Sequence, residues 1–347
     1  MNICLFGIYD SKYARNRVLI LGFKDRGFNV IECKVDPKKY RGIRKFFRLY
    51  REYRKVKNLN LDHIIVAFPG HTVVWFAYLL FGRKIIFDAF VSLYNSEVED
   101  RKTVSALSVR ALYYWLLDFI SCMLAKTVLL DTNTHIAYFV KRYHIARSKF
   151  IRVLVGTTAK DFYPCAQRES AKFIVHFHGH FTPLHGLEYV IEAAHILHEH
   201  RDVHFQIIGG GLGERAIKDR VAYLDLHNIE FMNSAPFDVL NKYINKASVC
   251  LGIFGDTTKA RMVIPNKVFE ALACGKPVIT QNSDAIAELL VDQESVLLCE
   301  GGNAQDLAEK ILLLKEKQTL QKKIAANGYH IFMQKLQPHM IVGDIIG

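Results

Sequence analysis

The chain has 347 residues, half of them hydrophobic, which is enough for two domains with separate cores. Lysine and arginine outnumber aspartate and glutamate by 46 to 34, so the net charge is +12. No segment reaches the roughly 18 to 20 uninterrupted apolar residues of a spanning helix, and the seven scattered cysteines contain no Cys-x-x-Cys pair. The composition thus argues against a membrane-spanning protein, a disulfide framework and a cysteine-zinc site, and indicates a reducing cytosol.

The first half of the chain alternates short apolar runs with helical patterns. Its first run lacks the basic start and the cleavage site of a signal peptide, so we expect a strand there. A long helical pattern covers about residues 103–126. The predicted strands are residues 2–7, 29–33, 63–68, 84–90, 127–132 and 151–156. Strands that alternate with helices indicate a parallel sheet with helices on both faces.

A basic segment, residues 38–57, interrupts this pattern. It holds ten Lys or Arg residues against one acid, Glu52, which is +9 of the net charge of +12. Aromatic and aliphatic residues recur within it at helical spacing, so we predict a basic amphipathic helix. Such a helix would dock on an anionic membrane leaflet, or would simply pack its aromatic stripe on its own sheet. Nucleic acid is a third partner to consider, but no recognition motif supports it.

The second half of the chain repeats the alternation of strands and helices. The polar segment 163–170 separates it from the first half. The predicted strands are residues 173–178, 203–208, 229–232, 248–254, 277–281 and 296–299, and the helices are 186–200, 213–224, 236–247, 264–274, 283–290 and 304–316. We therefore expect two doubly wound parallel sheets that face each other, with ligands at the carboxyl ends of the strands in the cleft between them.

Residues 264–280 are the most informative stretch of this half. They predict a helix that stops at Gly275 and leads at once into a short strand. A single acid, Glu270, lies mid-helix on an apolar background, one turn after Asn266 and Lys267. A buried carboxylate needs a partner or hydroxyl donors, and a ribose would supply two hydroxyls. The alternative is a helix acid that pairs with Lys267 or Lys276.

Together with three other segments, 155–164, 175–194 and 205–211, this stretch resembles the retaining family 4 glycosyltransferases, which have the GT-B fold. The resemblance implies two facing Rossmann-like domains with a cleft between them. We expect an acceptor-side domain at 1–164, joined by a C-terminal tail, 328–347, that crosses back to it. The nucleotide-sugar donor domain would be 165–327.

The resemblance also implies roles for single residues. Glu270 would bind the ribose and counts as catalytic, with Asn266 and Lys267 beside it. The Gly209–Gly210 turn would lie near the base and ribose, as a glycine-rich turn at a helix start can. Lys259 and Arg261, with Lys267, would bind the diphosphate, or would form a solvated basic loop.

Two departures from the family pattern affect the donor site. The family's Glu-x7-Glu motif has a further glutamate eight positions before the one at 270, and that position is Met262 here, so the donor sugar cannot be carried over. The family's phosphate-binding Arg and Lys are His180 and His185. These histidines would bind phosphate with help from Lys259 and Arg261, or donor affinity would be weak or pH-dependent. The alternation of His176, His178 and His180 is also typical of metal ligands, but no Cys or acid lies close in sequence, so we expect no metal and no cofactor.

In the first domain, Asp88 ends a predicted strand where many family members carry a histidine beside the transferred sugar. It would orient a sugar hydroxyl or stabilise an oxocarbenium-like centre, or would only bind backbone amides. Asp10 is a similar candidate on the acceptor side. Arg15 and Arg17 open the first helix, where they would bind an anionic acceptor or lie as surface charges.

These features predict a cytoplasmic enzyme, peripheral on the inner membrane face, that moves a sugar from a nucleotide-diphosphate sugar to an acceptor hydroxyl. Retention of configuration is implied by the resemblance alone. The acceptor would be a glycan or lipid-linked molecule of cell-envelope or polysaccharide synthesis. The alternatives are a nucleotide-sugar epimerase or phosphorylase on the same fold, and a non-catalytic membrane-surface protein.

Overall fold

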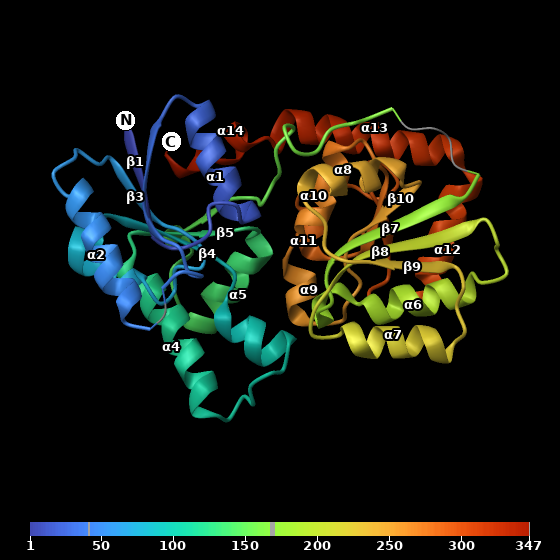
Figure 1. Ribbon diagram of the computed structural model, residues 1–347, viewed down its shortest axis with the longest axis horizontal. Helices are drawn as coiled ribbons and strands as arrows, with labels where there is room; N and C mark the ends of the chain where they lie inside the picture. The colour runs from blue at the N-terminus through green and yellow to red at the C-terminus, as the bar shows by residue number, and fades with distance from the viewer. Residues whose placement is uncertain (41, 167–170, 347) are drawn as a thin grey trace. The chain divides into compact units, whose positions relative to one another are not determined.

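The computed structural model describes residues 1–40, 42–166 and 171–346. Within these residues the chain forms two six-stranded parallel sheets, each in its own compact unit (Figure 1). The first unit contains Met1–Gly156 and the residues from Pro338 onward, and the second contains Thr157–Gln337. Both sheets carry helices on both faces, as the alternation in the sequence predicts.

The sheet of the first unit has the strand order β2-β1-β3-β4-β5-β6. Its strands are β1 (Asn2–Ile8), β2 (Asn29–Val35), β3 (His63–Val66), β4 (Ile85–Phe90), β5 (Thr127–Leu130) and β6 (Phe150–Arg152). Its helices are α1 (Ala14–Asp25), α2 (Arg44–Val56), α3 (Val74–Phe81), α4 (Val109–Leu124), α5 (Asn133–Tyr143) and α14 (Pro338–Ile341).

Alternating side chains of β1 show how this sheet is covered. Ile3 and Leu5 belong to a core cluster with α1 and α14, whereas Cys4 and Phe6 belong to a cluster with α2 to α5. In Figure 1 α1 and α14 accordingly lie on one side of the sheet, and α2 and α4 on the other. The chain order reverses at β1, so the carboxyl ends of β1 and β3 form the switch point of this sheet.

The sheet of the second unit has the order β12-β11-β10-β7-β8-β9. Its strands are β7 (Phe173–His180), β8 (Val203–Gly210), β9 (Ile229–Met232), β10 (Val249–Leu251), β11 (Val278–Gln281) and β12 (Leu297–Cys299). Its helices are α6 (Leu187–Ile196), α7 (Glu214–Tyr223), α8 (Phe237–Lys246), α9 (Thr258–Met262), α10 (Asn266–Ala273), α11 (Asp284–Ala287), α12 (Ala304–Glu316) and α13 (Gln318–Lys335).

The two faces of the second sheet differ in character. The face under α6, α7 and α12 is a continuous apolar core that includes Val175 and Phe177 of β7. The opposite face is covered by α8 and α10 (Figure 1). It carries the buried polar side chains of His176, His178 and Gln206. The order of the strands reverses between β7 and β10, so a ligand site is expected at the carboxyl ends of these two strands.

Three boundaries differ from those expected. The basic helix α2 begins at Arg44 rather than at residue 38, and Arg41 lies outside the described residues. The first unit ends at Gly156 rather than 164, because residues after it bind the second unit: the Tyr163 amide donates to Asn241 Oδ1. Residues 328–337 also belong to the second unit, because they continue α13, which packs on α10.

Gly209 is the position at which the second sheet tolerates no side chain. Its φ is +145°, and a Cβ there would lie 1.9 Å from the carbonyl oxygen of Gly179. We expect Gly209→Ala to lower the free energy of unfolding by about 3 kcal/mol or more, because β7 and β8 must separate. Gly27→Ala is the control, since a Cβ at Gly27 has open space and only its φ of +80° opposes the change. Equal urea midpoints for the two variants would contradict this account.

Candidate donor site

The loops that follow β7 and β10 lie side by side at the switch point of the second sheet. The Phe254 amide, after β10, donates to the carbonyl oxygen of His185 at 3.1 Å. Gly186, with φ +60°, has no room for a Cβ, which would lie 2.5 Å from the Gly255 nitrogen. The chain therefore builds a compact backbone turn at the carboxyl edge, where parallel sheets bind ligands.

Lys267 brings an unpaired positive group to this turn. Its side chain is 4% exposed, and its Nζ has no hydrogen-bond partner among the described residues. Nζ lies 3.7 Å from the centre of the Phe177 ring, and a Cβ on Gly179 would lie 3.1 Å from it. Burial holds the pKa of Lys267 well below its usual range, although the nearby Glu270 carboxylate opposes this shift. An orphaned ammonium beside a glycine turn indicates a site for an anion.

Glu270 is buried at the end of a chain of hydrogen bonds. Its Oε2 lies 2.6 Å from His178 Nε2, His178 Nδ1 lies 3.0 Å from His176 Nε2, and His176 Nδ1 lies 2.9 Å from Gln206 Oε1. These residues come from α10 and from adjacent β7 and β8. The sequence alternatives for Glu270 were a pair with Lys267 or with Lys276, and the structure gives it His178 instead.

The direction of this chain of hydrogen bonds depends on how the Gln206 amide is turned. Burial, with the neighbouring His178 as the second cause, lowers the pKa of His176 well below its usual range, so His176 is neutral. If its hydrogen points to Gln206, His178 must be an imidazolium in order to donate to the carboxylate. If the Gln206 amide is turned the other way, each neutral ring passes a hydrogen toward Glu270. In both cases His178 Nε2 donates to Oε2 of Glu270 and fixes the position of the carboxylate.

The two histidines that were predicted to bind phosphate, His180 and His185, differ in their surroundings. His180 is exposed at the end of β7. His185 Nδ1 contacts the carbonyl oxygen of His180, and burial and the Lys267 charge hold the pKa of His185 well below its usual range. His185 therefore contributes to the loop through its contact with the His180 carbonyl, and Lys267 is the basic side chain placed beside the turn. Among residues 1–40, 42–166 and 171–346, no cluster of three or more His, Cys, Asp or Glu is arranged to hold a metal ion.

The remaining predicted donor residues lie in several places. The Gly209–Gly210 turn pairs with Gly179–His180 and so borders the site. Asn266 opens α10 next to Lys267, and Lys259 is buried in α9. Arg261 is exposed and lines a different cavity of about 630 Å³. The acids of that cavity are Asp256, Asp284, Asp292, Glu300 and Asp306.

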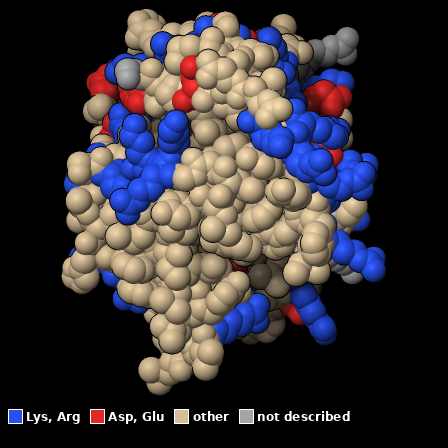
Figure 2. Space-filling model, turned by 90° about the vertical axis from the view of Figure 1, so that its left-hand side faces the viewer, with Lys and Arg blue, Asp and Glu red and all other residues tan. Residues whose placement is uncertain are grey.

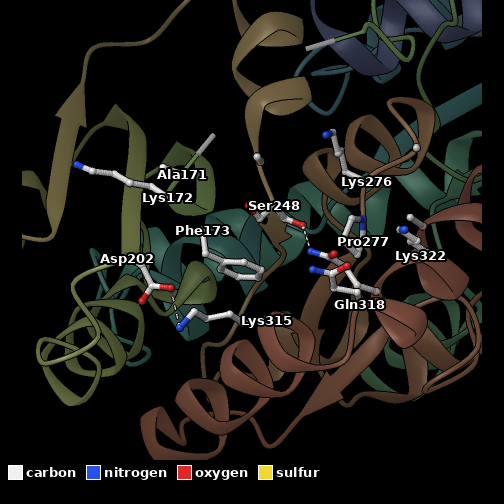
Figure 3. A pocket seen from close by; sticks show the side chains of 14 residues that line it. Ala171, Lys172, Phe173, Asp202, Ser248, Lys276, Pro277, Lys315, Gln318 and Lys322 are labelled. Carbon is white, nitrogen blue, oxygen red and sulfur yellow. Dashed lines mark hydrogen bonds and ion pairs between the residues drawn. The ribbon is translucent and has the colours of Figure 1, made fainter. Parts of the chain in front are cut away.

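A second cavity, of about 640 Å³, lies at the opposite edge of the same sheet (Figure 3). It is lined by residues at the amino ends of the strands, among them Phe173, Ser248 and Pro277. Lys315 enters it from α12 but is bound to Asp202 at 2.8 Å. This cavity is separate from the donor residues, and it offers a matched lysine, Lys276, whose pKa is also lowered by burial.

In the first unit the structure brings Asp88 and Arg15 together. Both side chains are fully buried, and Arg15 Nη2 donates to Asp88 Oδ1 at 2.8 Å while Nε lies 3.1 Å from each carboxylate oxygen. Arg15 Nη1 also donates to the carbonyl oxygens of Val153 and Leu154. Neither residue is a surface charge at a helix start. Asp10, by contrast, is exposed, and Arg17 is half-buried.

This buried pair makes a stability prediction that separates a structural from a catalytic role. We expect Asp88→Asn to lower the free energy of unfolding by about 3 to 5 kcal/mol, because Arg15 is left as an uncompensated buried charge. The double variant Arg15→Met/Asp88→Leu should recover most of this loss. Urea denaturation measures both. An unchanged midpoint for Asp88→Asn would show that the pair does not hold this domain together.

His178 and Gln206 are the site residues that the sequence analysis missed. The alternation of His176 and His178 was interpreted as a possible metal ligand set. The same alternation places both rings on one face of β7. The structure shows that α10 covers this face, and this tertiary contact, which the sequence does not reveal, gives Glu270 its partner His178.

Residues 172–317 match the family model described as glycosyl transferases group 1. An uncharacterised glycosyltransferase of Methanocaldococcus jannaschii is 24% identical over 303 residues, which are 84% of this chain and 76% of the relative. An amylovoran biosynthesis glycosyltransferase of Erwinia amylovora is 30% identical over 138 residues, 39% of this chain and 34% of the relative.

A solved structure, the Anabaena protein HepE in complex with UDP-glucose, has the same fold. The TM-score is 0.76 at 16% identity, and the likeness covers 100% of this chain and 98% of that one. At this identity the likeness concerns the fold alone. The chain thus has the two-domain GT-B fold, and its second domain is similar to the glycosyl transferases group 1 family over residues 172–317.

Proposed function

We propose that this glycosyltransferase moves a sugar from a nucleotide-diphosphate sugar to an acceptor hydroxyl. The observation that carries the proposal is the buried, unpartnered ammonium of Lys267 beside the Gly179 turn. A desolvated cation at the carboxyl edge of a Rossmann-like sheet is costly for the free protein. Charge-assisted hydrogen bonds from a bound diphosphate would offset this free-energy cost.

The expected chemistry is charge stabilisation at the leaving group. As the bond from the sugar to the diphosphate breaks, negative charge grows on the phosphate oxygen, and Lys267 is positioned to stabilise it. Glu270, oriented by His178, would accept hydrogen bonds from the ribose hydroxyls. In the retaining mechanism that the resemblance implies, the leaving phosphate takes the acceptor proton. This scheme assigns the positive charge to Lys267 and needs no metal ion.

The acceptor is proposed to be a glycan or a lipid-linked glycan of envelope or polysaccharide synthesis, at the cytoplasmic membrane face. The relative from Erwinia amylovora belongs to the biosynthesis of amylovoran, which supports a polysaccharide product. The basic residues of α2 support contact with an anionic membrane. In the described residues, no helix combines the length and the hydropathy that crossing a bilayer requires.

The test is release of nucleotide from a panel of UDP-, GDP-, ADP- and CMP-linked sugars, with and without a membrane extract as acceptor source. We expect one nucleotide sugar to be consumed, with acceptor-dependent transfer of its sugar and about tenfold or greater loss of rate in Glu270→Gln. Glu294→Gln, an exposed acid of the same domain, is the control. Conversion of the donor alone, without acceptor, would instead indicate an epimerase. No consumption of any donor would contradict the proposal.

A further inference from the structure

Helix α4 of the first domain is apolar on the outside. Its buried side consists of Ala111, Asp118, Ser121 and Cys122. Its exposed side carries large apolar side chains at helical spacing, such as Leu112, which is 56% exposed. The exposed set is Val109, Leu112, Tyr113, Leu116, Ile120 and Met123. A surface helix normally buries its apolar side and exposes its polar side, so the exposed apolar side of α4 indicates that it binds a partner.

The buried polar side of α4 explains why the helix cannot turn over. Asp118 accepts hydrogen bonds from the Ser92 hydroxyl, the Tyr143 hydroxyl, and the Leu93 and Tyr94 amides. Rotating α4 to bury its leucines would break all of these bonds and remove Cys122 from the core cluster beneath the helix. The apolar stripe is therefore fixed on the outside.

The stripe continues onto the two neighbouring helices. α3 packs beside α4 and presents Trp75 and Leu79, the latter 69% exposed. α2 lies beside α3 through the ring contact of Phe46 with Trp75, at 5.5 Å between centroids. Its exposed apolar residues are Ile43 at the cap, Phe47 and Tyr50. We call the outer side of α2, α3 and α4 the apolar face.

Positive charge borders the apolar face, and free negative charge is missing from its three helices. Their Lys and Arg residues are Arg44, Lys45, Arg48, Arg51, Arg54, Lys55 and Arg110. Their acids are Glu52, which is paired with Arg48 and Lys55, and the buried Asp118. Figure 2, which faces the left-hand side of Figure 1, shows a broad surface free of charged residues, with Lys and Arg gathered on both flanks and some Asp and Glu above them.

We propose that the apolar face docks on an anionic lipid bilayer, with the side chains of α3 and α4 in the boundary between headgroups and acyl chains. An apolar stripe flanked by cations is the arrangement by which interfacial helices bind such membranes. A second copy of this chain fits the apolar face less well, because the basic flanks of the two copies would lie against each other. The inference rests on the membrane contact in the proposed function and names the surface of the first domain that makes it, which is separate from the donor residues. The sequence analysis placed the membrane contact on the basic segment 38–57, whereas this proposal places the main apolar contact on α4.

The test is sedimentation of the full chain with vesicles of phosphatidylcholine mixed with phosphatidylglycerol, and with phosphatidylcholine alone. We expect binding to the anionic vesicles. The triple variant Leu112→Ser/Leu116→Ser/Ile120→Ser should lose about tenfold or more of that affinity at both low and high salt. Charge reversal at Arg44, Arg48 and Arg51 should act mainly at low salt. The matched control is Ile196→Ser/Leu212→Ser/Tyr223→Ser, which removes exposed apolar residues of the second domain and should bind like the wild type.

Two further readouts keep the outcomes distinct. Trp75 fluorescence should be quenched by brominated lipids if the face enters the bilayer. Nucleotide affinity of the serine triple should equal that of the wild type, so a failed donor site cannot be mistaken for a failed membrane surface. The proposal is overturned if the wild-type protein does not sediment with anionic vesicles, or if the serine triple binds them as the wild type does. It is also overturned if the lipid-free protein forms dimers that the serine triple converts to monomers.

Discussion

Lys267→Met should make the ligand-free protein more stable and at the same time weaken its affinity for a nucleoside diphosphate by about a hundredfold. Methionine fills a similar volume without the cost of a buried ammonium that has no partner. The same substitution removes charge-assisted hydrogen bonds to phosphate, which contribute about 1.5 to 3 kcal/mol each. Thermal unfolding and isothermal titration measure the two effects on one sample.

The pH dependence of stability gives the same prediction a second signature. The pKa of Lys267 is lowered in the folded protein, so the unfolded chain binds more protons between the folded pKa and the normal value of about 10.4. The cost of burying Lys267 is therefore fully present below the folded pKa and disappears as the pH rises toward 10.4. The stability advantage of Lys267→Met should shrink over that window.

Lys276→Met is the matched control for Lys267→Met. Lys276 is also a partly buried lysine of the second domain with a pKa lowered by burial, but it lies in the cavity at the opposite edge of the sheet. This variant should leave nucleotide affinity unchanged. Normal affinity in Lys267→Met, or equal losses in both variants, would show that Lys267 does not bind the diphosphate.

Glu270→Gln should weaken nucleotide binding about thirtyfold while the domain stays folded. Glutamine keeps an acceptor for His178 but loses the charge that strengthens hydrogen bonds from ribose hydroxyls. It also removes the carboxylate that raises the pKa of Lys267, so fewer Lys267 side chains are charged when the ligand arrives. The losses in Lys267→Met and Glu270→Gln should therefore be less than additive in the double variant.

The choice of glutamine rather than alanine matters for this test. Glu270→Ala leaves the buried Nε2 of His178 without a partner, at a cost of about 1 to 3 kcal/mol, and so mixes stability with binding. A urea midpoint of Glu270→Gln close to that of the wild type is the control. If titration then shows unchanged affinity for the preferred nucleotide, Glu270 does not bind the ribose.

The sequence predicts the two sheets and most elements, because alternating strands and helices leave little choice of architecture. The helix expected at 264–274 is α10 at Asn266–Ala273, and the strand at 229–232 is β9. The end of the last helix was harder to predict, because Gly328 reads as a break although it lies within α13, against Leu272. Residue type alone does not distinguish a glycine that permits close packing from one that ends a helix.

The candidate site was only partly predictable for a similar reason. Glu270 and Lys267 were predicted as donor-binding residues because they form part of an ordered motif. Their partners are set by tertiary contacts, which sequence spacing does not reveal: His178 meets Glu270 across 92 positions of the chain. Arg15 and Asp88 were predicted as separate candidates for ligand binding, yet they bind each other across 73 positions. A charged residue near a strand end looks the same in sequence whether its partner is a ligand or another side chain.

The most direct test of the central claim is thermal unfolding of the wild type and of Lys267→Met with UDP, GDP, ADP and CMP. A nucleotide at about 100 times its dissociation constant adds about 2.7 kcal/mol to stability. We predict that one of these nucleotides raises the melting temperature of the wild type clearly, and that the same nucleotide does not shift Lys267→Met. A wild-type protein that none of the four stabilises, or an equal shift in both proteins, would contradict the donor site described here.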